Sequence, residues 1–281
     1  MKGQTDSTSS RLAVKLLAVT AIDCHAHVMQ MDRPLSPLHH SAPKRDVFVE
    51  EYIDLLDRHG VSHGLLTAPS FYGSDNTLLL EALASQPGRL RGTAIVEPAI
   101  DFATLDKMRQ QGICGIRLNW IKRTALPDVS TSDYQRLFST VRDLGMHVEV
   151  FLEGELLGSV LPLIRKSRVN VALDHFGCPD PSTGVAGPGF QQVLEAVGAG
   201  DTWVKLSAPY RLRGADPQRY VDALLKAGGP ERLMWATDWP WVGHEDEVTY
   251  QQCIDWLTEW VPDGATRRTI LADTPRALFD Y

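Results

Sequence analysis

The chain has 281 residues, of which 43% are hydrophobic and 22% charged, and its formal net charge at pH 7 is −7. This composition is that of a globular protein, and the length suits one (β/α)8 barrel of about 250 residues. The acidic balance argues against nucleic-acid and anionic-membrane partners, which need a basic face, but leaves room for an anionic small-molecule substrate. Neither a monomer nor a homo-oligomer is excluded.

The N-terminal segment and the cysteines bear on where the protein functions. Residues 1–17 are expected to form a flexible tail before a single domain over residues 18–281. Leu12–Ala21 faintly resembles a signal peptide, but Lys15 interrupts its apolar run, and cleavage there would cut into the first predicted strand. The cysteines are scattered and form no C-x-x-C pair, which favours a reduced, cytoplasmic setting. They are Cys24, Cys114, Cys178 and Cys253.

Short apolar runs alternate with amphipathic stretches along the chain. The runs predict strands at Ala18–Val28, Val61–Thr67, Leu90–Val96, Ile113–Leu118, His147–Phe151, Asn170–Leu173, Trp203–Leu206 and Leu233–Ala236. The stretches predict helices at Val47–His59, Leu78–Ser85, Phe102–Gln111, Tyr134–Leu144, Leu156–Lys166, Phe190–Val197 and Tyr220–Ala227, with an eighth around Trp256. This alternation indicates parallel β-α units, and eight units favour an α/β fold of the (β/α)8 TIM-barrel class. A doubly wound open sheet is the alternative, although no G-x-G-x-x-G follows the first strand.

Chemically active side chains gather where predicted strands end. Asp23, His25 and His27 alternate along the first strand, so we expect them to share the face inside the barrel. His175 follows the sixth strand and Asp238 the eighth. A single buried histidine is usually a core residue, but the carboxyl ends of barrel strands converge on one site. The sequence therefore predicts that the three imidazoles and Asp238 meet in one pocket.

Three motifs carry a family resemblance. H-x-H at His25–His27, D-H-F-G at Asp174–Gly177 and T-D-W-P at Thr237–Pro240 resemble the amidohydrolase-related (amidohydrolase 2) branch of the amidohydrolase superfamily. That branch contains lactonases and metal-dependent decarboxylases, and the resemblance extends from Ile22 to Phe279. It implies a TIM-barrel hydrolase.

A second set of residues resembles the 2-pyrone-4,6-dicarboxylate lactonases. The resemblance implies that Arg117 and Arg123, after the fourth strand, and Arg211, after the seventh, bind substrate carboxylates, with Ser70 as a small polar contact. A guanidinium binds a carboxylate through two parallel hydrogen bonds, so three arginines suit a dianion. Phe151 replaces a substrate-contacting tyrosine of that family. The first loop also lacks a family tyrosine and offers His39 and His40, whose roles, like that of His244, are left open.

These assignments predict opening of a carboxylated lactone by water. Asp238 is the expected general base, while His25, His27 and His175 polarise the ring carbonyl. A pyrone leaves as a stabilised enolate, so the leaving group needs little protonation. The rivals are a zinc-dependent decarboxylase of the same family, a sugar-acid lactonase, and a non-catalytic binding barrel.

The need for a metal is the main open question. His25, His27, His175 and Asp238 would also form an adequate shell for one divalent ion such as zinc. No lysine ends the fourth strand where carbamylation could bridge two metals, and the resembled pyrone lactonases are metal-independent. We therefore expect no obligatory cofactor, with one zinc ion as the alternative.

Overall fold

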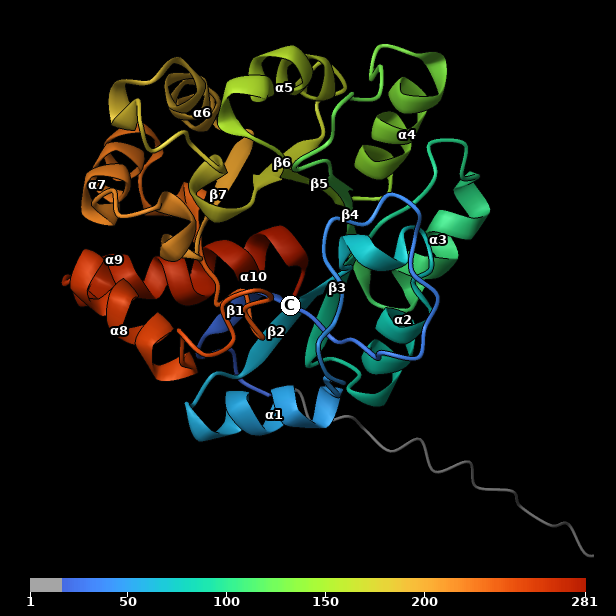
Figure 1. Cartoon of the computed structure of the whole chain (residues 1–281), viewed down its shortest axis with the longest axis horizontal. Coiled ribbons are helices and arrows are strands. Elements are labelled where there is room, and N and C mark those ends of the chain that lie inside the picture. The colour runs from blue at the N-terminus through green and yellow to red at the C-terminus, as the bar shows by residue number, and fades with distance from the viewer. Residues whose placement is uncertain (1–16) are drawn as a thin grey trace, which may run out of the picture.

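The barrel predicted from the sequence is confirmed. The computed structural model describes residues 17–281, so the predicted tail over residues 1–17 lies, apart from Leu17, outside the described residues. Eight strands follow in chain order, each parallel to and hydrogen-bonded with the next (Figure 1). The strands are β1 (Ile22–Ala26), β2 (His63–Thr67), β3 (Leu90–Ala94), β4 (Ile113–Asn119), β5 (His147–Phe151), β6 (Asn170–Leu173), β7 (Thr202–Leu206) and β8 (Leu233–Trp235).

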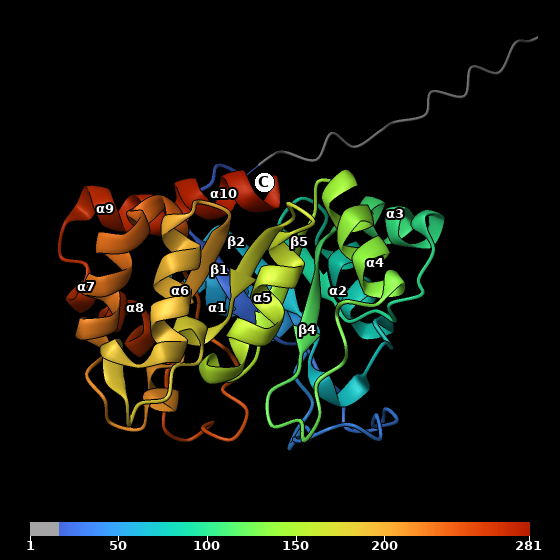
Figure 2. The same ribbon diagram turned by 90° about the horizontal axis from the view of Figure 1, so that it is seen from above.

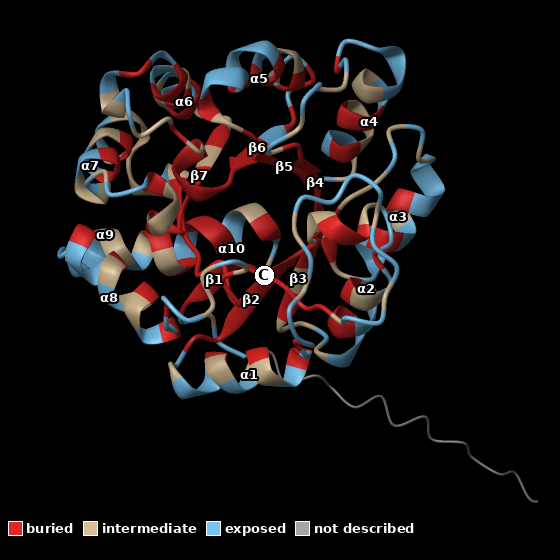
Figure 3. Cartoon of the chain, viewed as in Figure 1, coloured by how far each residue is buried: buried red, intermediate tan, exposed pale blue. Residues whose placement is uncertain are grey.

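Helices form the outer layer around these strands (Figure 1). They are α1 (Val49–Arg58), α2 (Thr77–Ser85), α3 (Phe102–Gln110), α4 (Ser132–Asp143), α5 (Leu157–Arg165), α6 (Pro188–Gly198), α7 (Pro217–Gly228), α8 (Tyr250–Trp260), α9 (Gly264–Arg268) and α10 (Thr274–Phe279). The strands are mostly buried along their whole length, whereas the helices other than α9 bury one side only, and α9 has no buried residue (Figure 3). Strands covered on both faces explain the nearly continuous apolar runs of the sequence.

Hydrogen bonds between β1 and the segment after β8 close the barrel. The His27 amide donates to the Trp239 carbonyl at 2.9 Å, and the Asp238 amide donates to the His25 carbonyl at 2.9 Å. Ala26 and Trp239 form a parallel bridge. The open sheet, the alternative topology, is therefore wrong, and the same bonds bring Asp238 beside His25 of β1 and His27, which follows β1.

Helix α10 covers the amino-terminal end of the barrel. Phe279, at its last turn, is fully buried in an inner cluster with Ile22, Ala172 and Met234, and its ring centroid lies 4.9 Å from that of His147. In Figure 2, α10 and the long loops after the strands lie at opposite ends of the barrel. The loop end is the one where (β/α)8 enzymes place their active sites.

Within residues 17–281, no helix is both long enough and apolar enough to cross a membrane.

Candidate active site

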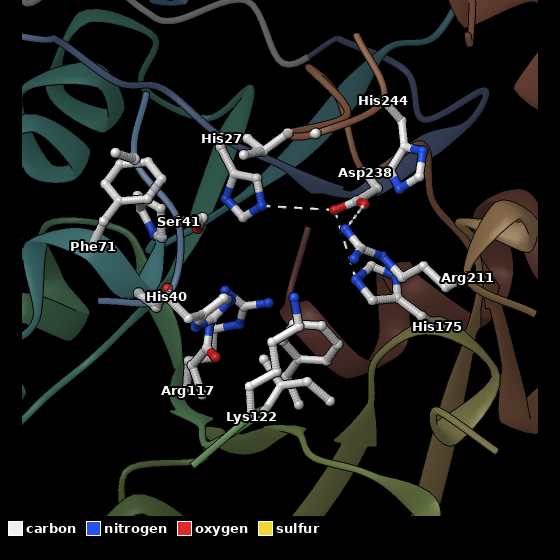
Figure 4. Close-up of a pocket in the computed structure, with 18 of the residues that line it drawn as sticks. His27, His40, Ser41, Phe71, Arg117, Lys122, His175, Arg211, Asp238 and His244 are labelled. Carbon is white, nitrogen blue, oxygen red and sulfur yellow. Dashed lines mark hydrogen bonds and ion pairs between the residues drawn. The ribbon is translucent and has the colours of Figure 1, made fainter. Parts of the chain in front are cut away.

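A cavity of about 450 Å³ opens at the carboxyl ends of the strands (Figure 4). It is lined by residues from the predicted site and from the surrounding loops. Those used below are His27, His40, Ser70, Arg117, Lys122, Phe151, His175, Arg211, Asp238 and His244.

Asp238 lies at the centre of three imidazoles. Its Oδ1 is 3.6 Å from His25 Nε2, 3.7 Å from His27 Nε2 and 3.6 Å from His175 Nε2. His175 and Asp238 adopt left-handed backbone conformations, with φ of 48° and 63°. Such conformations cost free energy and concentrate at functional sites. The three imidazoles thus meet around Asp238 as predicted, but only His27, His175 and Asp238 line the cavity, whereas His25 is fully buried beside them.

Tyr210 and Arg211, which follow β7, hydrogen-bond the second carboxylate oxygen of Asp238. Its Oδ2 accepts hydrogen bonds from the Tyr210 hydroxyl at 2.6 Å and from Arg211 Nη2 at 2.8 Å. Burial alone would raise the pKa of Asp238, but His175 and Arg211 outweigh it and hold its pKa well below the ordinary value. Asp238 is therefore a carboxylate at neutral pH, with Oδ1 directed at the imidazoles.

The imidazoles of His25 and His175 are neutral at pH 7. Burial is the main cause: it lowers the pKa of His25 well below its usual value and that of His175 to about 4. The ring of His175 is fixed by a 2.8 Å hydrogen bond between Nδ1 and Ser207 Oγ. Neutral rings can act as hydrogen-bond partners or as metal ligands.

Four buried charged side chains lie beneath His25. Lys205 Nζ is 2.6 Å from Glu149 Oε2 and 3.1 Å from Asp174 Oδ1. Arg117 contacts the same two carboxylates, at 3.1 Å to Glu149 Oε1 and 2.8 Å to Asp174 Oδ2. Sequence reasoning gave no role to Glu149 or Lys205, and it named Asp174 only as part of the D-H-F-G motif. The available signal was a charged residue inside an apolar strand, as in HVEVF and TWVKL.

The residues carried over from the lactonase resemblance separate into two groups. Arg211, Ser70 and Phe151 line the cavity. Arg117 also lines it, although the residue is only 3% exposed and its guanidinium is already paired with two carboxylates. Arg123 is not among the lining residues. Its substrate-binding role stays a prediction.

Lys122 precedes Arg123 in the chain and lines the cavity. Sequence reasoning gave it no role. Its ammonium points into the pocket (Figure 4). The amide of Lys122 donates to Glu153 Oε1 at 2.8 Å, and its φ is 60°. His40 and His244, whose roles were left open, also line the cavity, and Ser70 Oγ lies 3.5 Å from His40 Nδ1.

The expectation that Asp23 shares the inner face with His25 and His27 is wrong. The pairing of β1 with β2 shifts register between Asp23 and Ala26, which breaks the simple alternation. Asp23 instead accepts hydrogen bonds from the Thr237 hydroxyl at 2.7 Å and from Tyr250 of α8 at 3.2 Å. Its side chain therefore ties β1 to the segment after β8 and to the helix layer.

Comparison with known proteins identifies the family. The amidohydrolase family model matches residues 22–281. The chain belongs to the amidohydrolase family. It is 27% identical over 267 residues to a 4-sulfomuconolactone hydrolase of Hydrogenophaga intermedia, covering 92% of this chain and 88% of that one. It is 27% identical over 280 residues to a 2-pyrone-4,6-dicarboxylate hydrolase of Comamonas testosteroni, covering 94% and 91%.

A solved structure has the same fold as this amidohydrolase. A probable 2-pyrone-4,6-dicarboxylic acid hydrolase of Acinetobacter baumannii, with citric acid bound, superposes with a TM-score of 0.89 at 33% identity. The match covers 94% of this chain and 100% of that one. The expectation of a TIM-barrel enzyme of the amidohydrolase superfamily is confirmed.

The donor atoms around Asp238 fit a divalent metal. His25 Nε2 and His27 Nε2 are 3.2 Å apart, and each Nε2 of the three histidines lies 3.6–3.7 Å from Asp238 Oδ1. Ligands about 2.1 Å from a tetrahedral ion are roughly 3.4 Å from one another. His25, His27 and Asp238 could therefore hold one ion, with His175 beside them.

Proposed function

We propose that this amidohydrolase opens a lactone that carries anionic groups, by attack of water on the ring carbonyl. One observation carries the proposal: an ionised carboxylate lies among three imidazoles on the floor of a cavity whose walls bear cations. The relatives named as hydrolases of a pyrone dicarboxylate and of a sulfomuconolactone support this substrate class.

In the proposed reaction, Asp238 accepts a proton from the attacking water. The Nε2 atoms of His25, His27 and His175 surround Oδ1, and in this proposal the three imidazoles polarise the ring carbonyl as its oxygen gains charge. A carboxylate with a strongly lowered pKa is a weak base. A substrate anion that bonds to Arg211 would draw this guanidinium away from Oδ2 and so raise the basicity of Asp238.

Cations on the cavity wall would bind the anionic groups. Arg211 is one-third exposed and lies at the rim near the carboxylate, while Lys122 projects from the opposite loop. A divalent ion held by His25, His27 and Asp238 would act as a Lewis acid on the carbonyl oxygen and lower the pKa of bound water.

The test is hydrolysis of a lactone panel, with and without chelator, followed by loss of pyrone absorbance. We expect turnover of a carboxylated lactone and not of a neutral one. Asp238→Asn should lower kcat by about 10²–10⁴-fold, because it removes the general base, while the melting temperature changes little. Near-normal turnover by Asp238→Asn would contradict the assigned base. Carbon dioxide release from a hydroxybenzoate would instead support the decarboxylase alternative.

A further inference from the structure

Tyr210, whose hydroxyl bonds Asp238, stands on a short turn between two left-handed residues. The turn, Pro209–Leu212, is a single stretch of 3₁₀ helix, and the residues that flank it, Ala208 and Arg213, have φ of 52° and 50°. Tyr210 is only partly buried. The direction of its ring therefore depends on the side chains that pack against it.

The imidazole of His244 packs on the Tyr210 ring. The two ring centroids are 4.4 Å apart and the ring planes are inclined by 36°. Aromatic rings at this separation attract each other beyond the effect of burial. The Arg211 guanidinium also approaches this ring, at 5.4 Å from its centroid. In the proposed reaction a substrate anion draws Arg211 away, and His244 then remains as a support of Tyr210.

His244 is itself held in place by the segment that follows β8. Its amide donates to the Trp241 carbonyl at 2.6 Å, and the Glu247 amide donates to the His244 carbonyl at 3.0 Å. Nδ1 of the ring lies 2.8 Å from Glu247 Oε2, and a carboxylate only accepts, so Nδ1 donates. The ring lies on the same side of the pocket as Asp238 and Arg211 (Figure 4). Its rotation is thus fixed, although the side chain is 31% exposed.

These contacts form one series from the cavity mouth to the carboxylate. We propose that His244 is a positioning residue: by packing on Tyr210 it keeps the Tyr210 hydroxyl on Asp238 Oδ2, and so keeps Oδ1 directed at the attacking water. An error of 1 Å in such an alignment can cost about a hundredfold in rate. The inference rests on the proposed function, in which Asp238 is the base. His244 acts through its ring and makes no bond to the substrate.

Two substitutions of His244 test whether the ring or its nitrogens matter. His244→Ala removes the ring, so kcat for the lactone that the wild type opens should fall roughly three- to tenfold, with KM within about twofold. His244→Phe keeps a ring without nitrogen and should keep kcat within about twofold of the wild type. A loss confined to KM, or a phenylalanine variant as slow as the alanine variant, would overturn the proposal, because His244 would then bind the substrate directly.

A double-mutant cycle tests the route through Tyr210. Tyr210→Phe removes the hydroxyl that carries the effect to Asp238. Adding His244→Ala to Tyr210→Phe should therefore lower kcat no further, because residues that act through one another are not additive. If the double variant loses the full product of the two single effects, His244 acts by another route and the proposal is wrong.

The chain contains a matched control for a histidine–tyrosine pair. The rings of His59 and Tyr250 have centroids 4.7 Å apart and planes inclined by 33°, and the Tyr250 hydroxyl bonds Asp23 instead of Asp238. His59→Ala should keep the wild-type kcat at temperatures where it is folded. An equal fall in His59→Ala and His244→Ala would overturn the proposal, since loss of packing alone would explain both.

Crystal structures of the wild type and His244→Ala, grown under the same conditions, separate this inference from the proposed function. We expect the Tyr210 hydroxyl to bond Asp238 Oδ2 in the wild type and to leave it in His244→Ala. An unchanged bond in His244→Ala would refute the role of His244 and leave lactone opening untouched. A wild type that opens no lactone would refute the proposed function and, with it, this role.

Discussion

At the scale of single residues, a left-handed backbone selects which of two adjacent basic side chains enters the cavity. Lys122 has φ of 60°, and Glu153 holds its amide. The lysine side chain consequently points inwards, whereas Arg123 is not among the lining residues (Figure 4). The spacing of Arg117 and Arg123 in the sequence could not show this, because it depends on one turn after β4.

The variants Lys122→Met and Arg123→Met should therefore differ clearly in kcat/KM. Loss of Lys122 removes a charge-assisted hydrogen bond worth about 1.5–3 kcal/mol, so kcat/KM for a dianionic lactone should fall about ten- to a hundredfold. Arg123→Met should stay near the wild-type value. A larger loss in Arg123→Met than in Lys122→Met would restore the arginine to the role implied by the lactonase resemblance.

Tyr210 should set the acid limb of the pH–rate profile. Its hydroxyl donates to Asp238 Oδ2 at 2.6 Å and so stabilises the charged carboxylate. Tyr210→Phe removes this bond, which raises the pKa of Asp238. Because the base works deprotonated, kcat/KM should then decline at a higher pH than in the wild type. The measurement is kcat/KM followed down to the lowest pH at which both proteins stay folded, because the pKa of wild-type Asp238 lies well below its ordinary value. A limb that stays in place would mean that Asp238 is not the titrating base.

At the scale of elements, the sequence predicted the strands well and their register poorly. Apolar runs such as His147–Phe151 coincide with strands because a barrel strand is buried on both faces. The irregularity in β1 that turns Asp23 outwards leaves no trace in a period-two pattern. The positions of His25, His175 and Asp238 were predictable, since each follows from the end of a strand. The partners that orient them come from other strands and depend on packing.

Gly115 shows how tightly neighbouring strands fit. It pairs in register with His147 on β5, and a Cβ at Gly115 would overlap the His147 imidazole. Gly115→Ala should destabilise the fold by about 1–3 kcal/mol, because the buried ring and the barrel backbone cannot both move aside. Gly264→Ala is the control, since nothing lies within 4 Å of its Cβ. Urea unfolding compares the two, and equal midpoints would contradict this view of the strand packing.

At the scale of the whole molecule, the packed inner cluster under α10 and the candidate active site lie at opposite ends of the barrel. Phe279 of α10 is fully buried in the inner cluster. Helix α10 lies at the end of the barrel opposite the long loops that follow the strands (Figure 2). Phe279→Ala should cost about 3–5 kcal/mol of unfolding free energy. At temperatures where the variant remains folded, its kcat should match the wild type. A large fall in kcat without a fall in stability would show that α10 also shapes the active site.

The cover formed by α10 has a kinetic consequence. Within the described residues, this helix and the packed inner cluster occupy one end of the barrel, and the cavity opens at the other. In the proposed reaction, the incoming lactone and the outgoing ring-opened acid must then use the same cavity opening. Since opening a lactone adds a carboxylate, the outgoing species is the more anionic of the two and should linger on Arg211 and Lys122. Release of the product through this opening, rather than bond cleavage, would then limit turnover whenever the acid accumulates.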